Sequence, residues 1–148
     1  MELSGVLRVP GWRRDWISIA GTGYLEAGER GVWGMNAYIA GPYSAKTPKQ
    51  RDKNIRAAWK VGFELAKLGF FPITPHCNSA HMDPAQSHEF WLKGDIELMR
   101  RASDLIVLIP GWKDSPGARE ERDAATGFGL PVYYWPKDKD TLKSIIQE

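Results

Sequence analysis

The chain has 148 residues, of which 43% are hydrophobic and 26% are charged, a balance typical of one globular domain with a buried core. Its formal net charge of +2 argues against the strongly basic surface of a nucleic-acid-binding or membrane-binding protein. The single cysteine, Cys77, excludes an intramolecular disulfide, and the chain has no run of about 20 apolar residues. We therefore expect a cytoplasmic protein whose partner is a small molecule, with no nucleic-acid or membrane partner.

Residues 1–34 differ in composition from the remainder of the chain. They hold seven of the 15 glycines and three of the seven tryptophans, without a sustained helical or strand period. We interpret residues 1–34 as an appended N-terminal arm, irregular or poorly ordered, and residues 35–148 as the α/β domain.

From Asn36 onward, short apolar runs alternate with longer amphipathic stretches. The apolar runs predict buried strands at residues 37–40, 70–74, 104–109 and 131–135. The amphipathic stretches predict helices at residues 50–68, 87–102, 115–128 and 139–147. A loop is expected at residues 76–86, and Gly69 and Gly129 are expected to cap the helices before them.

This strand–helix alternation predicts an α/β fold, a Rossmann-like or flavodoxin-like parallel sheet of four to five strands with helices on both faces. Ligands of such sheets bind at the carboxyl ends of the strands. Six residues that follow strands are therefore candidates for substrate binding: Gly41, Pro42, Tyr43, Ser44, His76 and Trp112. Tyr43 and Trp112 could stack on a base, although Trp112 could equally pack on the sheet.

The helix expected at residues 115–128 carries one charge on its apolar face. Glu121 shares that face with Ala124, Ala125 and Phe128, whereas Glu120 falls on another side. A carboxylate there is costly unless it is paired or opens into a cleft, and Gly117 leaves the position one turn earlier without a side chain. The alternative is a glutamate at the edge of the stripe, paired with an arginine.

The preceding helix repeats the pattern with Asp95. Its stripe contains Trp91, Leu98, Met99 and Ala102, and Asp95 is the only charged member. The alternative to a functional role is a bond to a neighbouring backbone N–H or to Lys93. Two inward carboxyls over one sheet indicate a site where one is the nucleophile and the other assists a leaving group, as in glycoside chemistry.

Two segments could hold a phosphate. Ser115 caps a helix whose N-terminus attracts anions, and the loop after the first strand is followed by Lys46, Lys49 and Arg51. Solvated lysines are the alternative. His76, Cys77 and His81 lack a second pair of ligands at zinc spacing, so we predict neither a metal nor another cofactor.

Residues 36–136 resemble the nucleoside 2-deoxyribosyltransferase superfamily, including the deoxynucleoside 5′-monophosphate N-hydrolases. The resemblance rests on the ordered set Tyr38-Ile39-Ala40-Gly41-Pro42, Asp95, and Ser115-Pro116-Gly117-Ala118-Arg119-Glu120-Glu121. The segment Pro75-His76-Cys77-Asn78 is most similar to a less characterised branch. The glycine-rich phosphate loop of the hydrolases is replaced by Ser44-Ala45-Lys46-Thr47-Pro48.

The resemblance implies three catalytic residues: Glu121 as nucleophile, Tyr38 as the group that orients it, and Asp95 as the acid that contacts the base. It also implies that Ser115 and Gly117 contribute to substrate binding and that the chain forms a homodimer or higher homo-oligomer. The implied reaction is hydrolysis or transfer at an N-glycosidic bond through a covalent intermediate. The alternatives are a nucleotide-sensing module without turnover and a phosphoribohydrolase of the lysine-decarboxylase-like family.

Overall fold

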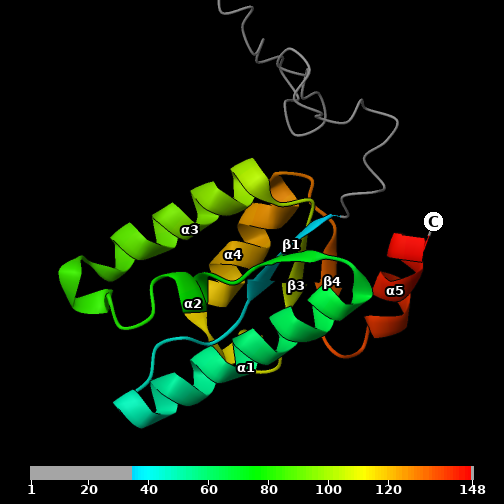
Figure 1. The fold of residues 1–148 in the computed structure, drawn as a ribbon. Coiled ribbons are helices and arrows are strands. Elements are labelled where there is room, and N and C mark those ends of the chain that lie inside the picture. Colours follow the sequence, from blue (N-terminus) through cyan, green and yellow to red (C-terminus); the bar gives the residue numbers. More distant parts are fainter. Residues whose placement is uncertain (1–34, 148) are drawn as a thin grey trace, which may run out of the picture. The chain divides into compact units, whose positions relative to one another are not determined.

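The computed structural model describes residues 35–147, which contain a four-stranded parallel sheet (Figure 1). The predicted N-terminal arm, residues 1–34, lies outside the described residues and stays a prediction. The strand order is β2-β1-β3-β4, and every pairing is parallel. The strands are β1 (Asn36–Ala40), β2 (Phe71–Ile73), β3 (Leu105–Leu108) and β4 (Val132–Tyr134). The predicted Rossmann-like α/β fold is confirmed, with four strands.

Four longer helices connect and follow the strands, and side-chain caps set where three of them begin. The helices are α1 (Pro48–Leu68), α3 (His88–Ala102), α4 (Pro116–Gly127) and α5 (Lys139–Gln147). Thr47, Ser87 and Ser115 each accept a hydrogen bond from a backbone N–H three residues later, which satisfies a free donor of the first turn. Gly69, at φ 106°, ends α1 in the left-handed region that glycine tolerates.

The helices cover both faces of the sheet, α1 and α5 on one and α3 and α4 on the other (Figure 1). Successive side chains of a strand point to opposite faces, so β1 contributes to two cores. Ala37 and Ile39 pack among residues of α1 and α5, whereas Tyr38 and Ala40 pack among residues of α3 and α4. This alternation places Tyr38 on the same side of the sheet as α4.

Three details of the predicted helix faces are wrong. The apolar residues of the helix expected at 50–68 predict a buried stripe that includes Trp59 and Phe63. In the structure the two side chains are 54% and 52% exposed, and their rings stack with centroids 5.4 Å apart. The buried face of α1 contains Val61 instead, so this face is rotated about the helix axis relative to the predicted stripe. Phe128 is 40% exposed because α4 ends at Gly127. Leu98, expected on the stripe of α3, is also partly exposed.

The segment between β2 and α3 is more structured than the expected loop. It contains the short helix α2 (Pro75–Asn78) and the 3-10 helix η2 (Asp83–Ala85), and a second 3-10 helix, η3 (Trp112–Asp114), follows β3. Pro75 begins α2 rather than simply ending β2, because proline fits the first turn of a helix. No helix of residues 35–147 combines the length and apolar character that crossing a membrane requires.

The strand order creates a crevice at the carboxyl ends of β1 and β3. These neighbouring strands lead to helices on opposite faces, α1 after β1 and α4 after β3, so their following loops diverge. Such a switch point is where open parallel sheets bind ligands.

Candidate active site

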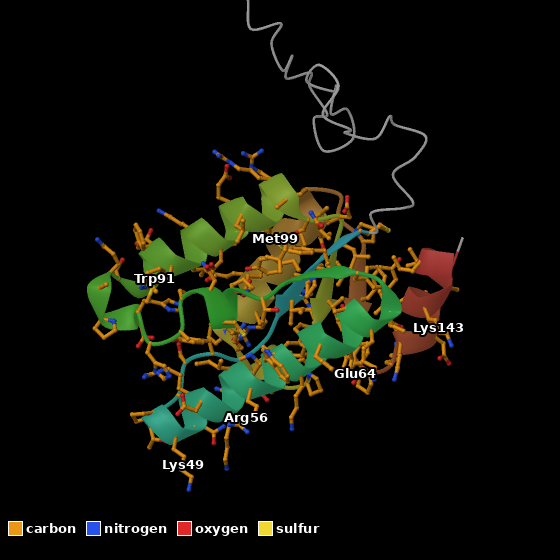
Figure 2. The ribbon with its side chains drawn as sticks, viewed as in Figure 1. Lys49, Arg56, Glu64, Trp91, Met99 and Lys143 are labelled. Carbon is orange, nitrogen blue, oxygen red and sulfur yellow. The ribbon has the colours of Figure 1, made fainter. Side chains whose placement is uncertain are left out.

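A cavity of about 670 Å³ lies at this switch point. Its lining comes from the segment after β1, from α2, from the first half of α3 and from the first turns of α4. In α3, Trp91 and Asp95 line the cavity, whereas Met99, one turn beyond Asp95, is fully buried in the core (Figure 2). The cavity therefore lies under the N-terminal half of α3, and its volume is in the range of small-molecule sites.

Glu121 lies on the inward face of α4 and lines this cavity, and it is 8% exposed. The hydroxyl of Tyr38, which is fully buried on β1, donates a hydrogen bond to its Oε2 atom. Burial raises the pKa of Glu121 to about 8, against the lowering effect of the Tyr38 hydrogen bond, and the charge of Asp95 raises it further. Burial also raises the pKa of Tyr38 well above its usual value, so its hydroxyl stays a donor.

Helical phase separates Glu121 from its neighbour Glu120, which is exposed. The alternative of an arginine partner is not what the structure shows: Arg122 pairs with Asp123, and Arg119 donates to the carbonyl of Lys113. Gly117 lines the cavity, but a Cβ there would meet Leu92 Cδ1 at 3.8 Å, an ordinary contact. The structure therefore has room for a Cβ at position 117, and the proposal that Gly117 leaves Glu121 uncovered stays a prediction.

Asp95 is the second carboxyl of the cavity and is half-buried on α3. Burial raises its pKa to about 6. Its expected alternative partner, Lys93, pairs instead with Glu89 at 2.6 Å. Asp95 interacts electrostatically with both Glu121 and Tyr38, so these three residues form one coupled group. A carboxyl with a raised pKa beside a second one is an arrangement for acid–base chemistry.

His76 lines the cavity and holds the turn after β1 in place through its side chain. Its side chain is 6% exposed, and its Nε2 lies 3.1 Å from the carbonyl oxygen of Gly41 and 3.0 Å from that of Pro42. Two carbonyl acceptors require a proton on Nε2, and burial lowers the pKa of the ring, so His76 is a neutral donor. Glycine at position 41 allows the turn after β1 to lie close to Ile109, because a Cβ there would be 2.2 Å from Ile109 Cγ1.

A polar cluster of Tyr43, Asp83 and Arg51 also lines the cavity, and the sequence did not indicate that these three residues meet. The Tyr43 hydroxyl donates to Asp83 Oδ1 at 2.5 Å and accepts from the backbone N–H of His81 at 3.0 Å. Arg51 Nη1 lies 3.6 Å from Asp83 Oδ2. Asp83 belongs to a short 3-10 helix without a periodic signal, so no pattern could have connected it with Tyr43 and Arg51. His88, Leu92 and Asp114 also line the cavity and were not predicted.

Of the other predicted site residues, two line the cavity and one does not. Ser44 and Ser115 line the cavity, and Ser115 Oγ accepts from Ala118 N at 3.2 Å. Trp112 does not line it: its ring lies 5.5 Å from that of Tyr134, with Arg122 over its face at 4.8 Å. Trp112 packs beside the sheet, the second of its two expected positions.

The expected phosphate ligands are not brought together. Lys46 and Lys49 are exposed and lie outside the cavity lining, and Arg51 alone of the three expected cations reaches it. Within residues 35–147, no group of three or more histidines, cysteines or carboxylates is placed to hold a metal ion.

These features define a Rossmann-like α/β domain with a small-molecule cavity and two carboxyls of raised pKa at its switch point. A family model described as a domain of unknown function, DUF1937, matches residues 35–137, and the chain belongs to that family. Comparison with curated proteins finds no match. Among solved structures, the chain is similar to a 2-deoxyribosyltransferase from the psychrotolerant bacterium Bacillus psychrosaccharolyticus. The identity is 25%, the alignment covers 67% of this chain and 70% of that one, and the TM-score is 0.48.

Proposed function

We propose that the protein cleaves, or transfers a sugar at, the N-glycosidic bond of a (deoxy)nucleoside or its 5′-monophosphate. The observation that carries the proposal is the buried Glu121 carboxyl, held by the Tyr38 hydroxyl in a cavity that also contains Asp95. These are the three residues that the sequence resemblance selects as catalytic. The cavity volume of about 670 Å³ suits a nucleoside-sized ligand.

In the first step, the ionised Glu121 attacks C1′ of the sugar. The C1′–N bond breaks as the C1′–O bond forms, and its electron pair leaves with the base. Asp95 gives its proton to the departing base, directly or through one water. Burial raises the pKa of Asp95 to about 6, nearer to neutral pH than that of an ordinary aspartate. The step requires the form of the pair in which the one proton is on Asp95 and not on Glu121. The products of this step are the free base and a glycosyl ester of Glu121.

In the second step, an acceptor attacks C1′ and releases Glu121. If the acceptor is water, Asp95 takes its proton and the reaction is hydrolysis. If the acceptor is a second base, its ring nitrogen forms the new C1′–N bond, Asp95 takes the proton that this nitrogen loses, and the reaction is transfer. Two displacements at C1′ retain the configuration of the sugar.

Tyr38 is a positioning residue in this scheme. Its hydrogen bond engages Oε2 of Glu121 and fixes the plane of the carboxyl, which leaves Oε1 to attack. The bond also favours the ionised form of Glu121, which burial disfavours. Holding a nucleophile in one geometry lowers the entropic part of the barrier.

Incubation with a panel of nucleosides and 5′-monophosphates, with free base measured by chromatography, tests the proposal. We expect base release from at least one substrate. Glu121→Gln should lower it by about 1,000-fold or more, whereas the matched variant Glu120→Gln should stay within about threefold of wild type. Gln mimics the protonated carboxyl in shape, so folding should be preserved.

Comparable losses in the two variants, or robust activity of Glu121→Gln, would exclude Glu121 as the nucleophile. Saturable binding without base release from any substrate would instead identify a nucleotide-sensing module. Activity confined to ribonucleoside monophosphates would favour the phosphoribohydrolase alternative, although that family's PGGxGT loop is replaced here by Asp114-Ser115-Pro116-Gly117-Ala118.

A further inference from the structure

The charges around the cavity are mostly negative. Among its lining residues, Arg51 is the only lysine or arginine, and the four carboxyls are those of Asp83, Asp95, Asp114 and Glu121. One proton on the Asp95–Glu121 pair leaves three negative charges against one positive charge. Two histidines also line it, and one of them, His76, is held neutral by burial and by its carbonyl partners. Such a lining disfavours a phosphate dianion, because like charges repel strongly in a partly desolvated site.

The one arginine is already paired. Its Nη1 lies 3.6 Å from Asp83 Oδ2, and both side chains are partly buried, at 24% and 34% exposure. The Tyr43 hydroxyl donates to the other oxygen of Asp83, and this bond, with the nearby Arg51, lowers the pKa of Asp83. Asp83 is therefore ionised at neutral pH and offsets the charge that a phosphate would need.

The N-terminus of α4 offers an anion little compensation. Pro116 at the first helical position has no N–H, and Ser115 Oγ already accepts from Ala118 N. Asp114, immediately before Ser115, adds a negative charge to the same part of the lining. A 5′-phosphate at this helix end would meet a carboxylate rather than a free cation.

We propose, on the basis of the function proposed above, that the cavity selects unphosphorylated nucleosides, and that Asp83 is a specificity-determining residue that excludes 5′-monophosphates by neutralising Arg51. A nucleoside is uncharged, and its sugar hydroxyls can donate to the carboxylates that repel a phosphate. Discrimination therefore comes from an unfavourable interaction with the competitor as well as from contacts to the preferred substrate.

The test compares a deoxynucleoside with its 5′-monophosphate. The ratio of kcat/KM is measured for the two substrates, and calorimetry gives the ratio of Kd in a Glu121→Gln background, where turnover is blocked. In wild type, kcat/KM should be about tenfold or more higher for the nucleoside than for the monophosphate. Asp83→Asn should lower this ratio by roughly tenfold. Asparagine keeps an acceptor for the Tyr43 hydroxyl, so the variant removes charge and little else.

Three further variants show whether the charge of Asp83 causes the discrimination. Asp140→Asn removes an equal charge from an exposed position of α5 that lies outside the cavity lining, so it should leave the ratio unchanged. Arg51→Met should widen the nucleoside preference, and the double variant Asp83→Asn/Arg51→Met should lose the narrowing. If Asp83→Asn does not fold, the wild-type and Arg51→Met ratios still decide the question.

A wild-type preference for the monophosphate, equal values for the two substrates, or an equal effect of Asp140→Asn and Asp83→Asn would overturn the inference. These outcomes are distinct from failure of the proposed reaction. Base release with a monophosphate preference would leave the reaction standing and refute the selectivity. A nucleoside preference in Kd without base release would leave the selectivity standing and refute the proposed reaction.

Discussion

Glu121 and Asp95 carry the same functional group in different surroundings. Glu121 is almost fully buried beneath α4 and its pKa is raised to about 8, whereas the half-buried Asp95 has a pKa of about 6. The two carboxyls interact, so they titrate as a pair. At neutral pH the single proton of the pair lies mainly on Glu121, which has the higher pKa. The reactive form in our scheme is therefore the minor one, with Glu121 ionised and the proton on Asp95.

This pairing predicts a bell-shaped dependence of kcat/KM on pH. Below about pH 6 both carboxyls hold a proton and the nucleophile is lost, and above about pH 8 neither does and the acid is lost. In Asp95→Asn only Glu121 titrates between these values, so activity should be lower but should rise once with pH and then level off.

Rate measurements from pH 5 to 9.5 on a substrate without ionisable groups in this range check the prediction. Glu89→Gln, on an exposed position of the same helix, is the control and should retain both limbs. An alkaline limb that persists in Asp95→Asn would assign the acid to another residue.

Part of the site could be predicted from single residues. Glu121 and Asp95 each appear as the one charged residue on an apolar stripe. Burying such a charge costs free energy unless it is paired or faces a cleft. Tyr38 was predicted from the resemblance, and the structure joins it to Glu121. The Tyr43–Asp83–Arg51 cluster could not be predicted, because its members come from a loop, a 3-10 helix and the first turn of α1, which only tertiary folding brings together.

At the scale of elements, the turn after β1 positions one side of the cavity. Gly41 follows the last residue of β1 and lies so close to Ile109 that a Cβ would be 2.2 Å from its Cγ1 atom. Ile109 is 2% exposed and follows β3, so it has little room to move. The carbonyl oxygen of Gly41 also accepts from His76, which connects the turn to α2.

Gly41→Ala should therefore lower the free energy of unfolding by about 1–3 kcal/mol through overpacking. Gly94→Ala is the matched control. Gly94 is in the middle of α3 with no atom near a new Cβ, so this change should raise the free energy of unfolding by roughly 0.5–1 kcal/mol. Urea denaturation of both variants checks the two signs, and a Gly41→Ala variant as stable as wild type would show that the turn relaxes freely.

The long helices could be predicted from their amphipathic period, and α1, α3 and α4 also have a capping residue at the start. The short elements α2, η2 and η3 could not, since three or four residues give no periodic signal. Trp59 and Phe63 were misplaced because hydrophobicity alone does not say whether a side chain faces the sheet or solvent.

At the scale of the molecule, the parallel sheet and its ligand crevice follow from the order of strands and helices. The order β2-β1-β3-β4 places the switch point between β1 and β3, where the cavity lies. The family model begins at Met35, the first residue that the structure describes. The N-terminal arm at residues 1–34 and the homo-oligomer remain predictions.

The covalent glycosyl–Glu121 intermediate is tested most directly by mass spectrometry. The protein is mixed with excess substrate, quenched in acid within the first turnovers and digested. The account predicts that the peptide containing Glu121 gains the mass of one pentosyl group, that fragmentation places the group on Glu121 rather than Glu120, and that Glu121→Gln shows no gain. Base release at an undiminished rate with the pentosyl group absent from Glu121, or present on another residue, would contradict it.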